Sequence, residues 1–183
     1  MKNTKFNKVT KIITKILEVT HWVGTALLIA AGVCALAFPE GLKYLVDFGE
    51  NATIDSYTFE ASVLGADGTI HAGAFAVYAF GAAIAMILVA MIFRNLNLIV
   101  KKSEEESHFA KDNVRMMKEI GIFSIAIPVV TLITSIIFRI VIGVDTAEIV
   151  MNGEGIIMGI IVLCLTQFFA RGAELEEEVD GLL

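Results

Sequence analysis

The chain has 183 residues, of which 56% are hydrophobic and 19% charged, and its formal net charge is −6. Soluble domains typically carry about 25% charged residues. This composition, with a mean hydropathy of +0.75, therefore excludes an ordinary soluble protein. The two cysteines, Cys34 and Cys164, lie inside apolar runs without CxxC spacing, so no disulfide scaffold or zinc site follows from them.

Four apolar stretches are long enough to cross a membrane, because a hydrocarbon core of about 30 Å needs about 20 helical residues. The predicted spans, in chain order, are residues 16–38, 72–98, 117–143 and 147–170. They predict an all-α integral membrane fold, a single domain built as a bundle of four transmembrane helices. A kink is expected at Pro128 in the third span, since its ring blocks one backbone hydrogen bond. The first span is too long for a cleaved signal peptide and lacks a clear cleavage site, so we interpret it as a retained helix.

The N-terminal segment before the first span has helical periodicity. Its apolar residues are Val9, Ile12, Ile13, Ile16 and Leu17, with lysines on the other face. Such a helix could lie on anionic lipid. Alternatively, it extends the first span and supplies the charge that sets the orientation of that span. We favour this second interpretation.

The loop at residues 39–70 separates the first two spans and carries an alternating apolar pattern, followed by the turn signal "ADG". The alternating residues are Ile54, Tyr57, Phe59, Ala61 and Val63. They predict a small β-hairpin packed on the outer helix ends. We favour a structural cap over a ligand sensor, since nothing in this loop specifies a ligand.

The distribution of Lys and Arg predicts the orientation, because cytoplasmic loops of membrane proteins carry an excess of both. Most of the 14 basic residues fall on one side of the predicted membrane. They are Lys2, Lys5, Lys8, Lys11, Lys15, Arg94, Lys101, Lys102, Lys111, Arg115, Lys118 and Arg171. Both termini and the loop at residues 99–116 are therefore expected in the cytoplasm, with loop 39–70 outside. The expected location is a bacterial cell membrane, as a multi-pass protein.

Two charges fall inside the predicted spans. Arg139 lies about one turn from the outer end of the third span, and Glu154 about two turns into the fourth. An intramembrane charge is costly unless it is paired, so an ion pair between these residues is expected. The pair could serve a proton or ion relay, or it could be a structural clasp. We favour the clasp, since one pair is not a pathway.

The cytoplasmic loop is expected to hold the start of the third helix, near Ala110 to Asp112, with Asp112 as N-cap. The acidic tail at residues 171–183 is expected to continue the fourth helix and to end at Gly181. Its apolar residues Leu175, Val179 and Leu182 fall on one helical face. Five acids surround them, namely Glu174, Glu176, Glu177, Glu178 and Asp180.

This tail allows two interpretations. An apolar stripe bordered by acids suits docking against a partner with a basic rim. Alternatively, the stripe packs within the chain on the start of the third helix, and its acids pair with Arg115, Lys118 or the N-terminal lysines. The two interpretations are compatible, because a helix that is held closed internally can act as a switch.

The sequence contains no recognisable catalytic or metal-binding constellation. The three histidines, His21, His71 and His108, fall at different levels and cannot converge on one metal. HExxH, GxSxG and phosphate-binding glycine-loop motifs are absent from the sequence. We therefore expect no enzyme activity, no cofactor and no metal.

Two cytoplasmic segments carry a resemblance to a known family. "HFAKDNVRMMKEIG" matches a PF-x-x-x-N-x-x-x-L-x-x-I-G pattern, and "FARGAELEEEVDGLL" matches F-x-x-G-x-x-L-x-x-E-x-D-L-T-V. The matching positions are Phe109, Asn113, Met117, Ile120, Gly121, Phe169, Gly172, Leu175, Glu178 and Asp180. Both segments resemble the small bacterial four-helix membrane family catalogued as domain of unknown function 2975, over nearly the whole chain. His108 departs from the family's Pro, and Gly181 interrupts the final apolar turn.

The resemblance implies a four-helix membrane protein without an established activity. Genes of this family often stand beside a small Cro-like helix-turn-helix regulator, which implies a membrane partner that holds or releases a transcription factor. No direct contact with nucleic acid is implied.

Two functions are therefore weighed. The first is a non-enzymatic, regulatory membrane protein that binds a cytoplasmic partner such as a small transcription regulator. The residues expected to bind this partner are Phe109, Asn113, Met117, Leu175, Glu177, Glu178 and Val179. The alternative is a small transporter or channel-like subunit that uses Arg139 and Glu154. A homo-oligomer is left open, because small-residue faces such as Gly155 and Gly159 can pack a bundle or a dimer.

Overall fold

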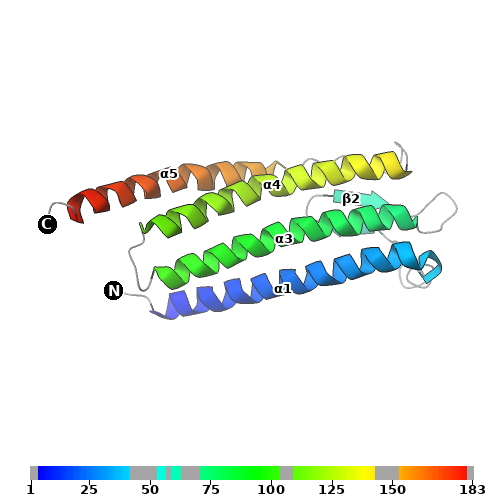
Figure 1. The fold of residues 1–183 in the computed structure, drawn as a ribbon, viewed down its shortest axis with the longest axis horizontal. Coiled ribbons are helices and arrows are strands. Elements are labelled where there is room, and N and C mark those ends of the chain that lie inside the picture. The colour runs from blue at the N-terminus through cyan, green and yellow to red at the C-terminus, as the bar shows by residue number, and fades with distance from the viewer. Residues whose placement is uncertain are drawn as a thin grey trace. The chain divides into compact units, whose positions relative to one another are not determined.

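The structure, a computed structural model, describes residues 4–41, 53–56, 59–62, 71–103, 109–142 and 153–180 (Figure 1). Its elements in chain order are α1 (Thr4–Ala37), the 3-10 helix η1 (Pro39–Gly41), β1 (Thr53–Ser56), β2 (Phe59–Ser62), α3 (Ala72–Lys102), α4 (Lys111–Ile142) and α5 (Glu154–Asp180). The four α-helices in this part of the chain are each long and apolar enough to cross a membrane. The prediction of long apolar helices of membrane-spanning length is confirmed.

The helices are longer than the predicted spans. α1 begins at Thr4, so the N-terminal segment continues the first span as one helix, as we favoured. α4 begins at Lys111, where the start was expected, and α5 runs on to Asp180. Residues 147–152 of the predicted fourth span lie outside the described residues. At 1.5 Å per residue, the 34 residues of α1 extend about 51 Å, which is more than the bilayer core of about 30 Å.

The chain divides into two compact units. Unit 1 comprises Met1–His21, Leu88–Ile127 and Gly153–Leu183, and unit 2 comprises Trp22–Ile87 and Pro128–Asn152. Both units expose many large apolar side chains, which water would disfavour and lipid accommodates. Pro128 lies inside α4, and the kink expected there stays a prediction.

In unit 2, glycine residues allow the helices to pack closely. A Cβ atom built on Gly32 of α1 would lie 3.2 Å from the Phe80 ring of α3, and one on Gly81 of α3 would overlap the Thr134 side chain of α4. Ala79 and Ala83 of α3 are buried beside these contacts. Without a hydrophobic force between helices in lipid, such close packing supplies the stabilisation.

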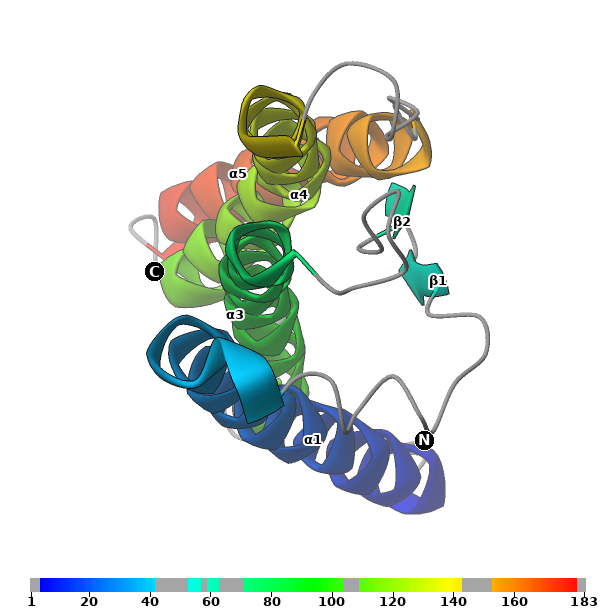
Figure 2. The same cartoon turned by 90° about the vertical axis from the view of Figure 1, so that its right-hand side faces the viewer.

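The two short strands of unit 2 form an antiparallel pair, with Thr53 opposite Ser62 and Ser56 opposite Phe59 (Figure 2). Of the alternating residues, Ile54 falls in β1, and Phe59 and Ala61 fall in β2. Tyr57 and Val63 lie outside the described residues. The "ADG" sequence at residues 66–68 lies outside the described residues. The cap role of this loop stays a prediction.

Candidate functional site

The end of unit 1 brings together the two segments that carried the family resemblance. Phe109, just before α4, packs against Phe169 of α5 in a tilted arrangement, with ring centroids 5.6 Å apart and an interplanar angle of 45°. A Cβ atom on Gly172 would lie 2.5 Å from Cδ1 of Phe109, so the missing side chain lets the ring lie against the α5 backbone. We call Phe109, Phe169 and Gly172 the aromatic clasp.

A second contact fixes the same two helices, which run side by side in Figure 1. A Cβ atom on Gly159 would lie 2.7 Å from the carbonyl oxygen of Gly121, and one on Gly121 would lie 2.7 Å from Cγ of Leu163. The α4 and α5 backbones therefore approach each other directly at this glycine crossing. With the aromatic clasp, it fixes the register of α5 against α4 at two places.

Two ion pairs involve residues in the first turn of α4, close in sequence to Phe109 of the aromatic clasp. Lys111 Nζ lies 2.9 Å from Oε2 of Glu177, with both side chains largely exposed. Lys102 at the end of α3 pairs with Asp112 in the first turn of α4. The expected pairing of the tail acids with Arg115 and Lys118 is wrong for Glu177, whose partner is Lys111.

The tail beyond the clasp is an exposed helix. Leu175 and Val179 have 59% and 58% of their surface accessible, so the expected packing of this stripe within the chain is not formed by these two residues. Leu182 lies outside the described residues. We define the acidic tail surface by these two apolar residues and the exposed acids around them, Glu174, Glu176, Glu177 and Glu178.

The other predicted partner residues divide by burial. Asn113 is 1% exposed, so it helps to hold α4 in place and offers no surface to a partner in this conformation. Its backbone N–H donates to the Ala110 carbonyl at 2.8 Å, in the turn that starts the helix. Met117 is half-buried. Phe109 is exposed on one side and clasped on the other, so it links the tail to α4.

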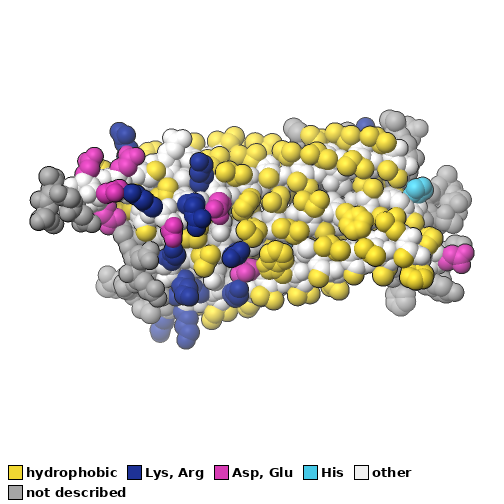
Figure 3. Space-filling view, viewed as in Figure 1, with side chains coloured by type: hydrophobic (Ala, Val, Ile, Leu, Met, Phe, Trp, Pro, Cys, Tyr) yellow, Lys and Arg dark blue, Asp and Glu magenta, His cyan; other side chains and the backbone are white. Residues whose placement is uncertain are grey.

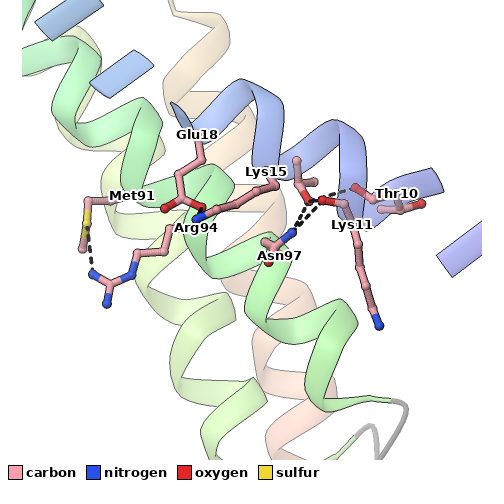
Figure 4. A network of polar contacts seen from close by, with 8 residues as sticks. Thr10, Lys11, Lys15, Glu18, Met91, Arg94 and Asn97 are labelled. Atoms are coloured by element: carbon pink, nitrogen blue, oxygen red, sulfur yellow. Dashed lines mark hydrogen bonds and ion pairs between the residues drawn. The ribbon is translucent and has the colours of Figure 1, made fainter. Parts of the chain in front are cut away.

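Amide side chains tie the remaining helices of unit 1 together (Figure 4). Asn97 of α3 donates from Nδ2 to the Lys11 carbonyl at 2.8 Å and to Thr14 Oγ1 at 2.9 Å, both on α1. Asn95 of α3 donates to Oε2 of Glu119 on α4 at 2.9 Å. The sequence interpretation missed these bonds, although an amide in an apolar helix is itself a signal of interhelical hydrogen bonding.

Arg139 and Glu154 both lie at helix ends. Arg139 is in the last turn of α4, and Glu154 is the first residue of α5 rather than two turns inside it. A cation near a helix C-terminus and an anion near an N-terminus are both favoured by the helix dipole. Each charge thus has a local reason for its position. Arg139 belongs to unit 2 and Glu154 to unit 1, and the ion pair between them stays a prediction.

The two described histidines, His71 and His21, make local contacts that stabilise their helices. Nδ1 of His71 accepts a hydrogen bond from the Ala74 N–H at 3.3 Å, as an N-cap of α3. Nδ1 of His21 lies 2.7 Å from the Leu17 carbonyl, and its ring packs on Phe93. His108 lies outside the described residues. Among the residues that the structure describes, no three His, Cys, Asp or Glu side chains lie together as a metal site requires.

Comparison with known proteins gives one match. A family model described as "Protein of unknown function (DUF2975)" matches residues 50–181. The matched region contains the aromatic clasp, the glycine crossing and the whole described tail, residues 171–180. Because α1 precedes it, the match is shorter than the near-complete coverage that the resemblance predicts. No curated protein and no solved structure matches the chain significantly.

Proposed function

This chain belongs to the DUF2975 family of proteins of unknown function, and from that premise we propose that it is a non-enzymatic membrane regulator that holds a cytoplasmic partner on its acidic tail surface. Both termini lie in the cytoplasm in this proposal. This orientation is inferred from the distribution of Lys and Arg along the sequence. Most of the basic side chains visible in Figure 3 gather at one end of the apolar surface.

The observation that carries the proposal is the exposure of Leu175 and Val179 on the last turns of α5. Most exposed apolar residues of this chain lie in the lipid-spanning runs, where exposure is favourable. These two instead lie beyond Arg171, among four glutamates, where the helix meets water. An apolar stripe with a charged border is the usual form of a helix that docks into a groove of another protein.

The structure around the tail supports a docking role because it holds the helix in a defined position. The aromatic clasp and the glycine crossing fix α5 against α4. A surface on a rigid helix binds with less loss of conformational entropy than a free tail. In this proposal the family-like segment at the start of α4 anchors the tail helix, and the one at the end of α5 is the docking surface.

The charge of the tail indicates the class of partner. A small helix-turn-helix regulator carries a basic face for DNA, and the four glutamates complement such a face. A regulator bound through that face could not bind DNA at the same time. The membrane protein would therefore sequester it.

Transport has less support. Arg139 and Glu154 each complement the dipole of their own helix end, so neither needs a transported ion to explain its position.

The test is affinity capture from native membranes in mild detergent, with co-purifying proteins identified by mass spectrometry. We compare the unmodified chain with E178K, with L175S/V179S and with E40K, which makes the same charge change at exposed Glu40 beyond the end of α1. We expect a small basic DNA-binding protein with the unmodified chain and E40K, and its loss with the two tail variants. All four chains should insert equally, because the changed residues are exposed. Equal capture by all four would contradict the proposal.

A further inference from the structure

On α3 and α5, the first charged residue after the apolar run at the unit 1 end is an arginine. α3 has no Asp, Glu, Lys or Arg from Ala72 to Phe93, which is about 33 Å of helix at 1.5 Å per residue. Arg94 follows directly. On α5 the uncharged run ends at Arg171, and on α4 the uncharged run is preceded by Lys118 and Glu119. The uncharged runs of α4 (residues 120–138) and α5 (residues 155–170) extend about 29 Å and about 24 Å at 1.5 Å per residue. Runs of this length are close to the bilayer core of about 30 Å, so these cations fall at the level of the lipid headgroups.

At this level the acids are turned inward while the cations are exposed. Glu18 of α1 is 8% exposed and accepts a hydrogen bond from Lys15 at 3.0 Å (Figure 4). Glu119 accepts a hydrogen bond from the buried amide of Asn95. The negative charge of this level is thereby satisfied inside the unit.

Three cations at this level have exposed side chains. Arg94, Lys118 and Arg171 are all exposed. Within the described part of the chain they make no ion pair, and the bond shown for Arg94 is to the Met91 sulfur at 4.0 Å. The glutamates of the tail lie further along α5, where Glu177 is held by Lys111. Figure 3 shows Lys and Arg side chains next to the apolar surface, with the acids of the tail beyond them.

We propose that Arg94, Lys118 and Arg171 form a basic collar that binds the phosphate groups of anionic phospholipids in the leaflet at this end of the helices. The guanidinium groups suit the collar because their planar donors match phosphate oxygens in pairs. The lysine adds a point charge from the third helix. This site is independent of partner docking at the tail, and it requires only that the helices cross a bilayer.

Phospholipid is the occupant that the position favours. An acidic peptide would have to approach side chains that emerge at the edge of the apolar surface, where lipid already surrounds the helices. An anionic headgroup is present there at high local concentration. Each Lys or Arg near such a surface raises the association by about fivefold.

The experiment measures lipid selectivity in bilayers. The full chain is reconstituted in phosphatidylcholine vesicles at about 0.15 M salt, and the association of spin-labelled phosphatidylglycerol is compared with that of spin-labelled phosphatidylcholine. The collar variant is R94Q/K118Q/R171Q. The matched control is K5Q/K8Q/K101Q, which removes the same charge from exposed lysines further along α1 and α3. R94K/K118R/R171K keeps the charge and tests that the positions tolerate change.

We expect the unmodified chain to prefer phosphatidylglycerol, and the collar variant to lose at least about fivefold of that preference. The matched control and the charge-keeping variant should retain most of it. Three results would overturn the collar: no preference in the unmodified chain, an equal loss in collar variant and matched control, which would indicate diffuse attraction by net charge, or a full loss in the charge-keeping variant.

Discussion

Individual glycines decide how closely the helices of unit 1 can pack, and they differ in what surrounds them. At Gly159 a new side chain would meet Cγ1 of Ile125 at 2.5 Å and the backbone carbonyl of Gly121 at 2.7 Å. At Gly172 it would meet the ring of Phe109, which can move. At Gly153, just before α5, it would meet no atom within 4 Å. The same substitution should therefore have three different effects.

Replacing Gly159 with Ala should lower the free energy of unfolding by about 2 kcal/mol, because backbone atoms cannot yield to an added methyl group. Unfolding in a detergent micelle by titration with SDS measures the change. G153A is the control and should be close to neutral. A neutral G159A would contradict the close approach of α4 and α5.

Replacing Gly172 with Ala should destabilise the protein by about 1 kcal/mol, because the Phe109 ring must shift away from α5. In an F109A background the same change should be nearly neutral. The double-mutant cycle over these two positions should thus give a coupling energy of about 1 kcal/mol. Additive effects would mean that Phe109 does not rest on Gly172.

At the scale of elements, the sequence predicted the helices better than their contacts. The long apolar runs and the start of α4 near Lys111 follow from hydropathy and capping signals. The face that each helix packs against its neighbours cannot be predicted in this way. A helix in lipid is apolar on every side, so its periodicity does not show which side packs. The rotation of each helix about its own axis decides which residues meet. It therefore decides that Phe109 contacts Gly172 and that Lys111 pairs with Glu177.

The attachment of α1 illustrates the same point. This helix precedes the region matched by the family model, and Asn97 of α3 holds it through the Lys11 carbonyl and Thr14. N97A should weaken this attachment by about 1–2 kcal/mol, since it removes two hydrogen bonds at a partly buried site. Limited proteolysis of α1 in detergent should become faster. S103A at the end of α3, whose hydroxyl bonds within its own helix, serves as the control, and equal proteolysis rates for the two variants would contradict the role of Asn97.

At the scale of the whole molecule, opposite ends of the helices face opposite sides of the membrane in the proposed orientation. Ser103 follows α3, and Gly41 ends the 3-10 helix after α1. In a chain with C34A and C164A, a membrane-impermeant maleimide added to intact cells should label G41C and leave S103C unlabelled. Inverted vesicles should give the reverse pattern. Labelling of both residues from one side would contradict the predicted orientation.

The central claim is that the acidic tail surface holds a cytoplasmic partner, and photo-crosslinking in living cells tests it most directly. Benzoylphenylalanine is placed at Val179, and at Ile160 as a control on the same helix, where the exposed side chain faces lipid in our account. We predict that position 179 crosslinks to a small basic cytoplasmic protein, that E177K/E178K abolishes this product, and that position 160 gives none. Crosslinks from position 179 that reach only the chain itself or lipid would contradict the claim.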